Sequence, residues 1–429
     1  MKYKYILILL LGFQDAFSQI ADSTHHQADS VEHITASEYL HHQHHSSNHI
    51  RVKADYDMGS VLNNSFLRKF IYGGTIDQEL IDENYKRLAH GPNHIGNTAD
   101  LAVQYRHFTG ELFGIKDIGF SAAVEWHLHN DMDFTDDAYL LVMDGNKAFA
   151  GKTADLSNTK YNYLKYSQIK LGLFKEHAQN HSEYGFQLAI NLGNQFEEFE
   201  AHHAALYTDG DGKSMELSGD FDYLESGYIG KNDGVVQGVG AGLDLFYEIE
   251  KYQHYQFKVE VANIGFIVWN KESLEYAKEE HVDFEGVEVD NIFKMPNSIL
   301  PANMTDSLHD YIIANGHRGS HATYTPLEID VVYQYFINNN ISATARFRHK
   351  LFGLYSPYFQ IGANYHIKEK YHIGADINYG GYTKLNIGLS LSMEINDNFV
   401  LNLRSRYLSG IYGSKFSGIG GFAQIDYKF

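Results

Sequence analysis

Eight histidines near the amino terminus have the residue type and spacing that could support metal binding. They are His25, His26, His33, His41, His42, His44, His45 and His49. Neutral imidazole is a good ligand for zinc, copper or nickel. A closed zinc site, however, needs four ligands in a fixed geometry, and this tract has no apolar periodic face that would fold it. We interpret it as a solvated tail, with weak mixed metal binding as the alternative, and predict no metal site and no cofactor.

Two other short patterns suggest chemistry at first sight. Asp209-Gly210-Asp211-Gly212 resembles part of a calcium loop but lacks the later acidic ligands, so a hairpin turn is the better interpretation. Ser320 precedes His321, and a hydrolase needs a serine beside a histidine, usually with an acid. No spacing in the chain singles out such a triad. We therefore predict no catalytic residues and a protein that is not an enzyme.

Six basic residues lie on one face of neighbouring strands in the carboxy-terminal third. They are Arg346, Arg348, Lys350, Lys384, Arg404 and Arg406. Facing a lumen, they could select anions. They could also pair with the acids of an inserted segment, Asp77, Glu79, Asp82 and Glu83, and so hold a plug in place. The second interpretation is favoured because unpaired buried charge is costly.

The elements that carry these residues are alternating β-strands. In the last segment, Ile425, Tyr427 and Phe429 fall on one face and Gln424, Asp426 and Lys428 on the other. The same period of two runs through 327–337, 341–348, 359–367, 373–379, 385–395 and 399–407, and tight Asn- and Gly-containing turns join several of these segments. Consecutive segments of this kind are typical of an up-and-down antiparallel barrel with a lipid-facing and a lumenal face.

Further strands are predicted in the amino-terminal two-thirds. They lie near 50–58, 100–108, 119–129, 160–174, 184–194, 214–224, 239–249 and 255–269. The total is about 14. The fold class is therefore all-β, a transmembrane antiparallel barrel over residues 50–429. Three helical inserts are predicted, near 64–89, 136–146 and 305–314, which would plug the lumen, cap a mouth or simply pack as loops.

The first residues fit a secretory signal peptide, residues 1–18. Lys2 and Lys4 precede a short apolar core, and Ala16 and Ser18 provide the small residues of a cleavage site before Gln19. Residues 19–49, the histidine-rich tail, are predicted to be disordered. These features and the strand pattern predict export to the cell outer membrane of a Gram-negative bacterium.

Composition limits the classes of partner. Of 429 residues, 14% are aromatic, with 32 tyrosines, and cysteine is absent. Abundant tyrosine suits the interfacial girdles of a barrel. The net charge of −20 argues against nucleic acid as a partner. The expected surroundings are outer-membrane lipid and a small or hydrophobic solute, and protein partners cannot be derived from composition.

Several strings, taken together, resemble a known family. They are Ser60-Val61-Leu62-Asn63-Asn64-Ser65-Phe66-Leu67, Tyr72-Gly73-Gly74-Thr75-Ile76-Asp77, Gly145-Asn146-Lys147-Ala148-Phe149-Ala150-Gly151, Leu171-Gly172-Leu173-Phe174-Lys175 and Val261-Ala262-Asn263-Ile264-Gly265-Phe266-Ile267-Val268-Trp269. This set resembles an uncharacterised, domain-of-unknown-function family of exported β-barrels from Bacteroidetes-type bacteria. The resemblance implies location and architecture, with no activity attached. A more distant likeness is to fatty-acid transporter barrels, whose amino-terminal hatch precedes the first strand, whereas the insert here follows it.

Three functions remain open at this level. The leading hypothesis is a passive channel or carrier for small or hydrophobic solutes, which a continuous polar lumen would support. The second is a structural or partner-binding barrel that anchors a surface or secretion assembly, which a lumen filled by residues 64–89 would support. The third is a lipid-modifying hydrolase, which would need a serine, histidine and acid at the lipid-facing rim.

Overall fold

The computed structural model describes residues 48–177, 181–212, 214–227, 235–251, 254–285, 315–367, 370–408, 410 and 416–429. The predicted signal peptide, the tail up to residue 47 and the insert near 305–314 lie outside the described residues. The three therefore stay predictions.

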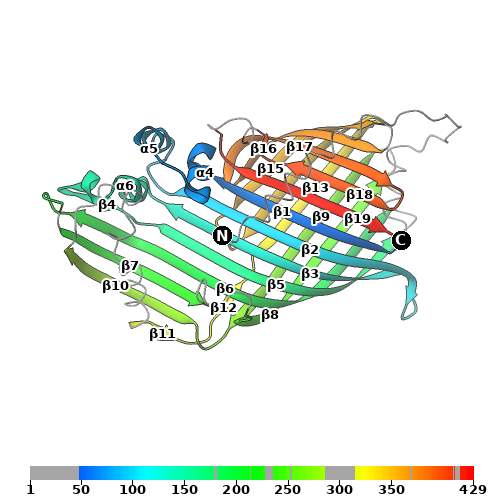
Figure 1. Cartoon of the computed structure of the whole chain (residues 1–429). Coiled ribbons are helices and arrows are strands. Elements are labelled where there is room, and N and C mark those ends of the chain that lie inside the picture. Colours follow the sequence, from blue (N-terminus) through cyan, green and yellow to red (C-terminus); the bar gives the residue numbers. More distant parts are fainter. Residues whose placement is uncertain are drawn as a thin grey trace. The chain divides into compact units, whose positions relative to one another are not determined.

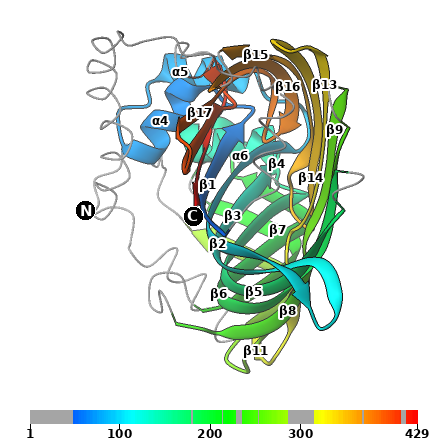
Figure 2. The ribbon, with the colours of Figure 1, turned by 90° about the vertical axis from the view of Figure 1, so that its right-hand side faces the viewer.

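Antiparallel strands close into a ring, as the period-two pattern predicts. The ring has 14 strands, which confirms the predicted fold class. In order around the ring they are β1 (His49–Ser60), β2 (Asn93–Leu112), β3 (Ile115–Phe134), β5 (Thr159–His177), β6 (Ser182–Thr208), β8 (Gly238–Lys251), β9 (Tyr255–Trp269), β13 (Leu327–Asn338), β14 (Ile341–Leu351), β15 (Ser356–Ile367), β16 (Tyr371–Gly381), β17 (Thr383–Asn396), β18 (Phe399–Ser405) and β19 (Ile419–Lys428). The last strand, β19, pairs with β1 from Met58↔Ile419 to His49↔Lys428 and closes the ring. Figure 2 shows the curved wall of strands, with α4 and α5 on one side.

The wall has an apolar outer face and a polar inner face. On β17, Leu385, Ile387 and Leu389 are exposed on the outside. Asn386, which lies between Leu385 and Ile387, is 5% exposed and faces the lumen. This difference follows from the pleat, because adjacent residues of a strand point to opposite faces. Exposed leucine and isoleucine on every second residue make a wall suited to lipid.

The two ends of the ring differ. At one end, the short-turn end, β2 and β3 are joined by Phe113 and Gly114, and β17 and β18 by Asp397 and Asn398. Exposed tyrosines surround this end, namely Tyr184, Tyr247, Tyr335, Tyr365, Tyr371 and Tyr427. The opposite, long-loop end carries the helices and additional strands (Figure 1). Outer-membrane barrels have this asymmetry, with short turns towards the periplasm and long loops outside.

A sheet extension continues past the ring at the long-loop end. Residues 182–193 of β6 pair with β8, but residues 196–208 pair with β7 (Ser214–Ser226). The strand β7 in turn pairs with β10 (Leu274–Glu285), and β4 (Lys152–Asp155) pairs with the end of β6. Two short strands, β11 (His317–Arg318) and β12 (Ala322–Tyr324), pair with β10 and β9. The predicted strand near 214–224 is thus present but lies outside the ring.

A large buried side chain packs at the point where β6 changes partner. The side chain of Trp269 is 1% exposed and stacks on Phe196, with ring centroids 5.8 Å apart. A Cβ on Gly193 would lie 2.6 Å from the Trp269 ring, so only glycine fits there.

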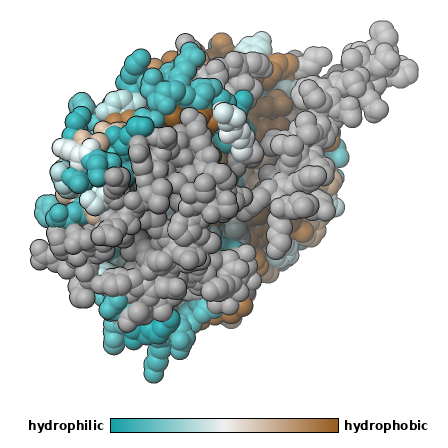
Figure 3. Space-filling view, turned by 60° about the vertical axis from the view of Figure 1, so that its left-hand side comes forward, coloured by the Kyte–Doolittle hydropathy of each residue, from teal (hydrophilic) through white to brown (hydrophobic). Residues whose placement is uncertain are grey.

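In the space-filling view that brings the left side of Figure 1 forward, hydrophilic residues dominate at the left and the bottom, and hydrophobic residues gather at the top and right (Figure 3).

Two glutamates face each other in the extension, and they predict a dependence on pH. Glu197 and Glu225 are register partners and share the Tyr223 hydroxyl, at 3.2 and 2.9 Å. Burial, and then the charge of Glu225, raise the pKa of Glu197 above its ordinary value. An acid with a raised folded pKa adds stability below its unfolded pKa, and this stability is lost as pH rises through the folded pKa.

We therefore expect Glu197→Gln to stabilise the extension at neutral pH by less than about 1 kcal/mol and to flatten its pH dependence. The measurement is amide hydrogen exchange of residues 214–226 between pH 4 and 7. The matched control is Glu216→Gln, at an exposed position of β7. Equal effects of the two variants would contradict the assignment.

Three short helices form a helical cap at the long-loop end. They are α4 (Asn64–Tyr72), α5 (Gln78–Tyr85) and α6 (Asp136–Asp144), and a 3₁₀ turn, η2 (Asn146–Phe149), follows α6. Each helix follows a residue whose side chain accepts a hydrogen bond from a backbone N–H of the first turn. These residues are Asn63 before α4, Asp77 before α5 and Thr135 before α6. The cap has its own apolar core, which includes Phe66, Leu67, Leu80, Ile81, Phe134, Tyr139 and Met143. No helix among the described residues is long and apolar enough to cross a membrane.

Polar contacts fasten the cap to the neighbouring loop. The Asn64 amide is fully buried and donates to the carbonyls of Gly410 and Gly418, at 3.2 and 3.0 Å. The Tyr139 hydroxyl donates to the carbonyl of Ile81 and so joins α6 to α5. The inserts near 64–89 and 136–146 thus contain helices that lie at the long-loop end.

Candidate functional site in the barrel lumen

Ion pairs join opposite walls of the lumen. The Arg348 guanidinium on β14 lies 3.2 Å from the Asp55 carboxylate on β1, and the Lys350 amine lies 3.3 Å from Asp100 on β2. Around the ring, β15 to β19 separate β14 from β1 on one side, and β2 to β13 separate them on the other. Side chains that meet across this distance bridge the lumen at their level.

Further contacts join these pairs into one network. Arg406 donates to Asp55 at 2.6 Å and lies 3.0 Å from Asp57. Arg348 also contacts Glu328 and Asp330, and Arg346 forms a two-point contact with Asp330. The Tyr407 hydroxyl donates to Asp57. Arg348, Lys350, Arg406, Asp55 and Asp57 are each between 2% and 7% exposed, so the network is buried.

The prediction that the basic residues pair with the acids of the insert near 64–89 was wrong. Asp77 instead caps α5 and lies 3.7 Å from Lys69, and Asp82 accepts from Gln78. The cap packs over the long-loop end through its apolar face, which leaves Asp77, Glu79 and Asp82 exposed. Five of the six basic residues do face the lumen, but their acids come from the strands. The sixth, Lys384, is exposed near the start of β17.

A polar cavity lies beside the network, between β13 and β18. Its volume is about 220 Å³. Its lining includes Gln334, Arg346, Gln360, Asn364, Asp376 and Arg404. Arg404 lies 3.5 Å from Asp376 and donates to the Tyr358 hydroxyl at 2.8 Å. The cavity therefore offers charged and amide groups to a small polar molecule.

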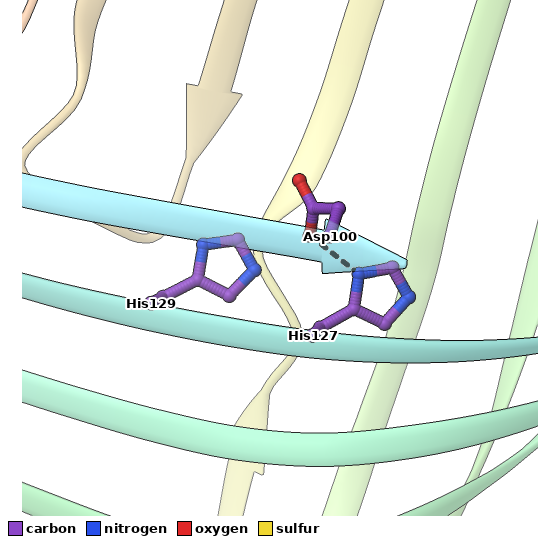
Figure 4. Close-up of side chains that lie close together, drawn as sticks. All are labelled: Asp100, His127 and His129. Atoms are coloured by element: carbon purple, nitrogen blue, oxygen red, sulfur yellow. Dashed lines mark hydrogen bonds and ion pairs between the residues drawn. The ribbon is translucent and has the colours of Figure 1, made fainter. Parts of the chain in front are cut away.

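A second part of the lumen, on β2, β3 and β5, holds two histidines among acids and a lysine. His127 Nδ1 lies 2.7 Å from Asp100, and its Nε2 lies 2.9 Å from Gln168 and 3.2 Å from Glu125. Lys170 bridges Glu125 and Asp244, at 2.9 and 2.6 Å. Among the described residues, the one group whose ligand atoms could hold a metal ion is Asp100, His127 and His129 (Figure 4). No site residue was predicted here, although the His127-x-His129 spacing places both side chains on one face of a strand.

The remaining sequence patterns have structural roles. Asp209 to Gly212 form the turn between β6 and β7, and Gly212 has φ +72°. The Ser320 hydroxyl donates to the carbonyl of Trp269, and the His321 ring packs on Phe196. Of the tail histidines, only His49 is described, as the first residue of β1.

One serine does contact a histidine in the lumen. The Oγ of Ser342 lies 3.0 Å from Nε2 of His366, and the other ring nitrogen of His366 faces His372 rather than a carboxylate. Ser342 is fully buried. This contact lies inside the barrel and away from the lipid-facing rim, so it does not favour a lipid hydrolase.

Comparisons with known proteins identify a family and several similar folds. The model described as "Family of unknown function (DUF5723)" matches residues 52–402. No curated protein matches the chain. Among solved structures, a TodX deltaS2S3 mutant monoaromatic hydrocarbon channel is 8% identical with a TM-score of 0.46, covering 90% of this chain and 92% of that one.

Two more solved structures are similar. The Ralstonia pickettii toluene transporter TbuX is 10% identical with a TM-score of 0.44, covering 90% of this chain and 91% of that one. A Pseudomonas aeruginosa FadL homologue is 9% identical with a TM-score of 0.42, with the same coverage. Likeness at this level carries no functional argument, so function is derived below from the lumen itself.

Proposed function

We propose that this chain, which belongs to the DUF5723 family of unknown function, is an outer-membrane β-barrel that passes small polar solutes through a lumen closed by ion pairs. The predicted family resemblance is confirmed. The apolar wall, the tyrosines at the short-turn end and the long opposite loops support a place in the outer membrane. That topology puts the cap and the sheet extension outside the cell.

The observation that carries the proposal is the pair of contacts across the lumen, Arg348 to Asp55 and Lys350 to Asp100. Charged side chains that reach across a barrel leave no continuous path at that level. Side-chain contacts can break and reform without any change in the wall, so they can act as a gate. The charged and amide side chains that line the cavity beside them support a polar solute.

The first experiment removes the side chains that cross the lumen. We expect the double variant Arg348→Ser/Lys350→Ser, reconstituted in planar bilayers, to conduct small ions at least about tenfold more than the wild-type chain, because a lumen without these side chains admits water. Lys384→Ser is the matched control, since it removes an exposed cation near a strand end. Heat-modifiable gel migration verifies that each barrel is folded.

The conductances of the wild-type chain and of the double variant together distinguish a closed lumen from an open one. A wild-type chain that conducts as freely as the double variant would show that the lumen is already open. A folded double variant that stays silent would show that the lumen carries no solute. If the double variant fails to fold, the single variant Lys350→Ser gives the same comparison for the contact with Asp100.

The second candidate is a barrel that binds a partner at the cell surface. The observation that favours it is the sheet extension, where β6, β7 and β10 continue the wall beyond the ring. A solute gate needs no such extension. Silence of the folded double variant would favour this second function.

A further inference from the structure

We propose that Asp100, His127 and His129 bind one divalent transition-metal ion, with zinc the best match. The register of two strands brings the three side chains together. His127 and His129 are two residues apart on β3 and therefore share its lumenal face, and Asp100 on β2 is the register partner of His127. One ligand atom from each residue lies within 4.8 Å of the others. Figure 4 shows both rings and the carboxylate gathered at one place.

The ligand set selects the class of ion. Two imidazoles and one carboxylate suit zinc, iron, nickel or copper, whereas calcium and magnesium prefer oxygen ligands. Zinc sites with three protein ligands keep a fourth position open for water or another molecule. Asp100, His127 and His129 likewise provide three protein ligands.

His129 has a nitrogen that the protein fold does not explain. Its Nε2 is buried and has no hydrogen-bond partner among the described residues, and the residue is 7% exposed. A buried polar atom without a partner costs about 1–3 kcal/mol. A metal ion between His129 and Asp100 would give this nitrogen a partner.

The other ligands are already held as metal ligands usually are. A metal-bound histidine donates its second ring N–H to a carboxylate or carbonyl, which fixes the ring. His127 has such acceptors at its Nε2, namely Gln168 at 2.9 Å and Glu125 at 3.2 Å. Its Nδ1 is directed to Asp100, whose second oxygen is held by Lys350 at 3.3 Å. Replacing the proton between Nδ1 and Asp100 by a metal ion would leave these outer contacts in place.

The charge of the lumen also favours a cation. The network linked by the contacts above contains the carboxylates Asp55, Asp57, Asp100, Glu125, Asp244, Glu328 and Asp330, and the cations Lys170, Arg346, Arg348, Lys350 and Arg406. Within these contacts, the carboxylates outnumber the cations by two. Buried charge is costly when it is unpaired, and one divalent ion would balance this set of contacts.

The site shares Asp100 with the proposed gate, but its test measures bound metal rather than conductance. The test uses the purified full chain, without an added affinity tag, refolded with zinc and then dialysed against a weak chelator. The tail histidines are the same in every variant, so any difference in metal content between variants reports on the lumen. We expect wild type to retain one more zinc per chain than His129→Gln, by elemental analysis. The matched control, His202→Gln, alters an exposed histidine of the extension and should retain the wild-type content.

Cobalt gives a second, spectroscopic readout. Cobalt-loaded wild type should show visible absorption bands of a four-coordinate site that are absent from His129→Gln and from His127→Gln, and affinity should fall at least about tenfold in each. Heat-modifiable migration verifies folding, and Asp100→Asn serves if a histidine variant does not fold. Equal zinc content and equal cobalt spectra in wild type and a folded His129→Gln would overturn the proposal.

Discussion

Replacing Asp55 by alanine is expected to destabilise the barrel by about 3–5 kcal/mol. The Asp55 carboxylate contacts both Arg348 and Arg406, and all three residues are at most 7% exposed. Removing the carboxylate leaves two guanidinium groups buried with less compensation. Unfolding by urea in lipid vesicles, followed by tryptophan fluorescence, measures the free energy of unfolding.

The matched control for Asp55→Ala is Lys69→Ala on the helical cap. Its ion pair with Asp77 spans 3.7 Å between side chains that are 37% and 60% exposed, so its loss should cost less than about 1 kcal/mol. Similar costs for the two variants would mean that water, rather than protein, surrounds Asp55.

A second large effect, on folding into bilayers, is expected when an arginine replaces a leucine on the outer face of the wall. Leu389 is exposed on the outer face of β17, and Ser390 lines the lumenal cavity. Charge on the lipid face near the midplane costs roughly 2–4 kcal/mol, whereas a lumenal site tolerates it. Leu389→Arg should therefore impair folding into bilayers far more than Ser390→Arg, as measured by the fraction of heat-modifiable protein. If Ser390→Arg were the worse variant, the facing of β17, or the membrane barrel itself, would be wrong.

The facing of the barrel wall could be predicted from the sequence alone. Leu385, Ile387 and Leu389 alternate with Asn386 and Ser390, and a slip of one residue would turn every apolar side chain inward. The period of two therefore predicts that the segment is a strand, which of its side chains face lipid and which of them face the lumen. The helical inserts at 64–89 and 136–146 were predicted for the same reason, since their apolar residues follow the helical period.

The strand count was less certain because β6 has two partners. Its apolar alternation from Tyr184 to Leu192 ends near Asn194, so the pattern does not predict that the strand continues as residues 196–208, which leave β8 and pair with β7. The cause is tertiary. Trp269, which is distant in sequence, packs against Gly193 next to the point where β6 changes partner.

The lumenal site was decided by tertiary structure for a different reason. The sequence placed Arg348 and Lys350 in the lumen, but their partners Asp55 and Asp100 are 293 and 250 residues away along the chain. Only closure of the ring brings β14 opposite β1 and β2. In the same way, the sequence puts His127 and His129 on one face, and the register between β2 and β3 adds Asp100. Alternation along a strand is local and can be read from sequence, whereas a pairing across the barrel depends on how all the strands close.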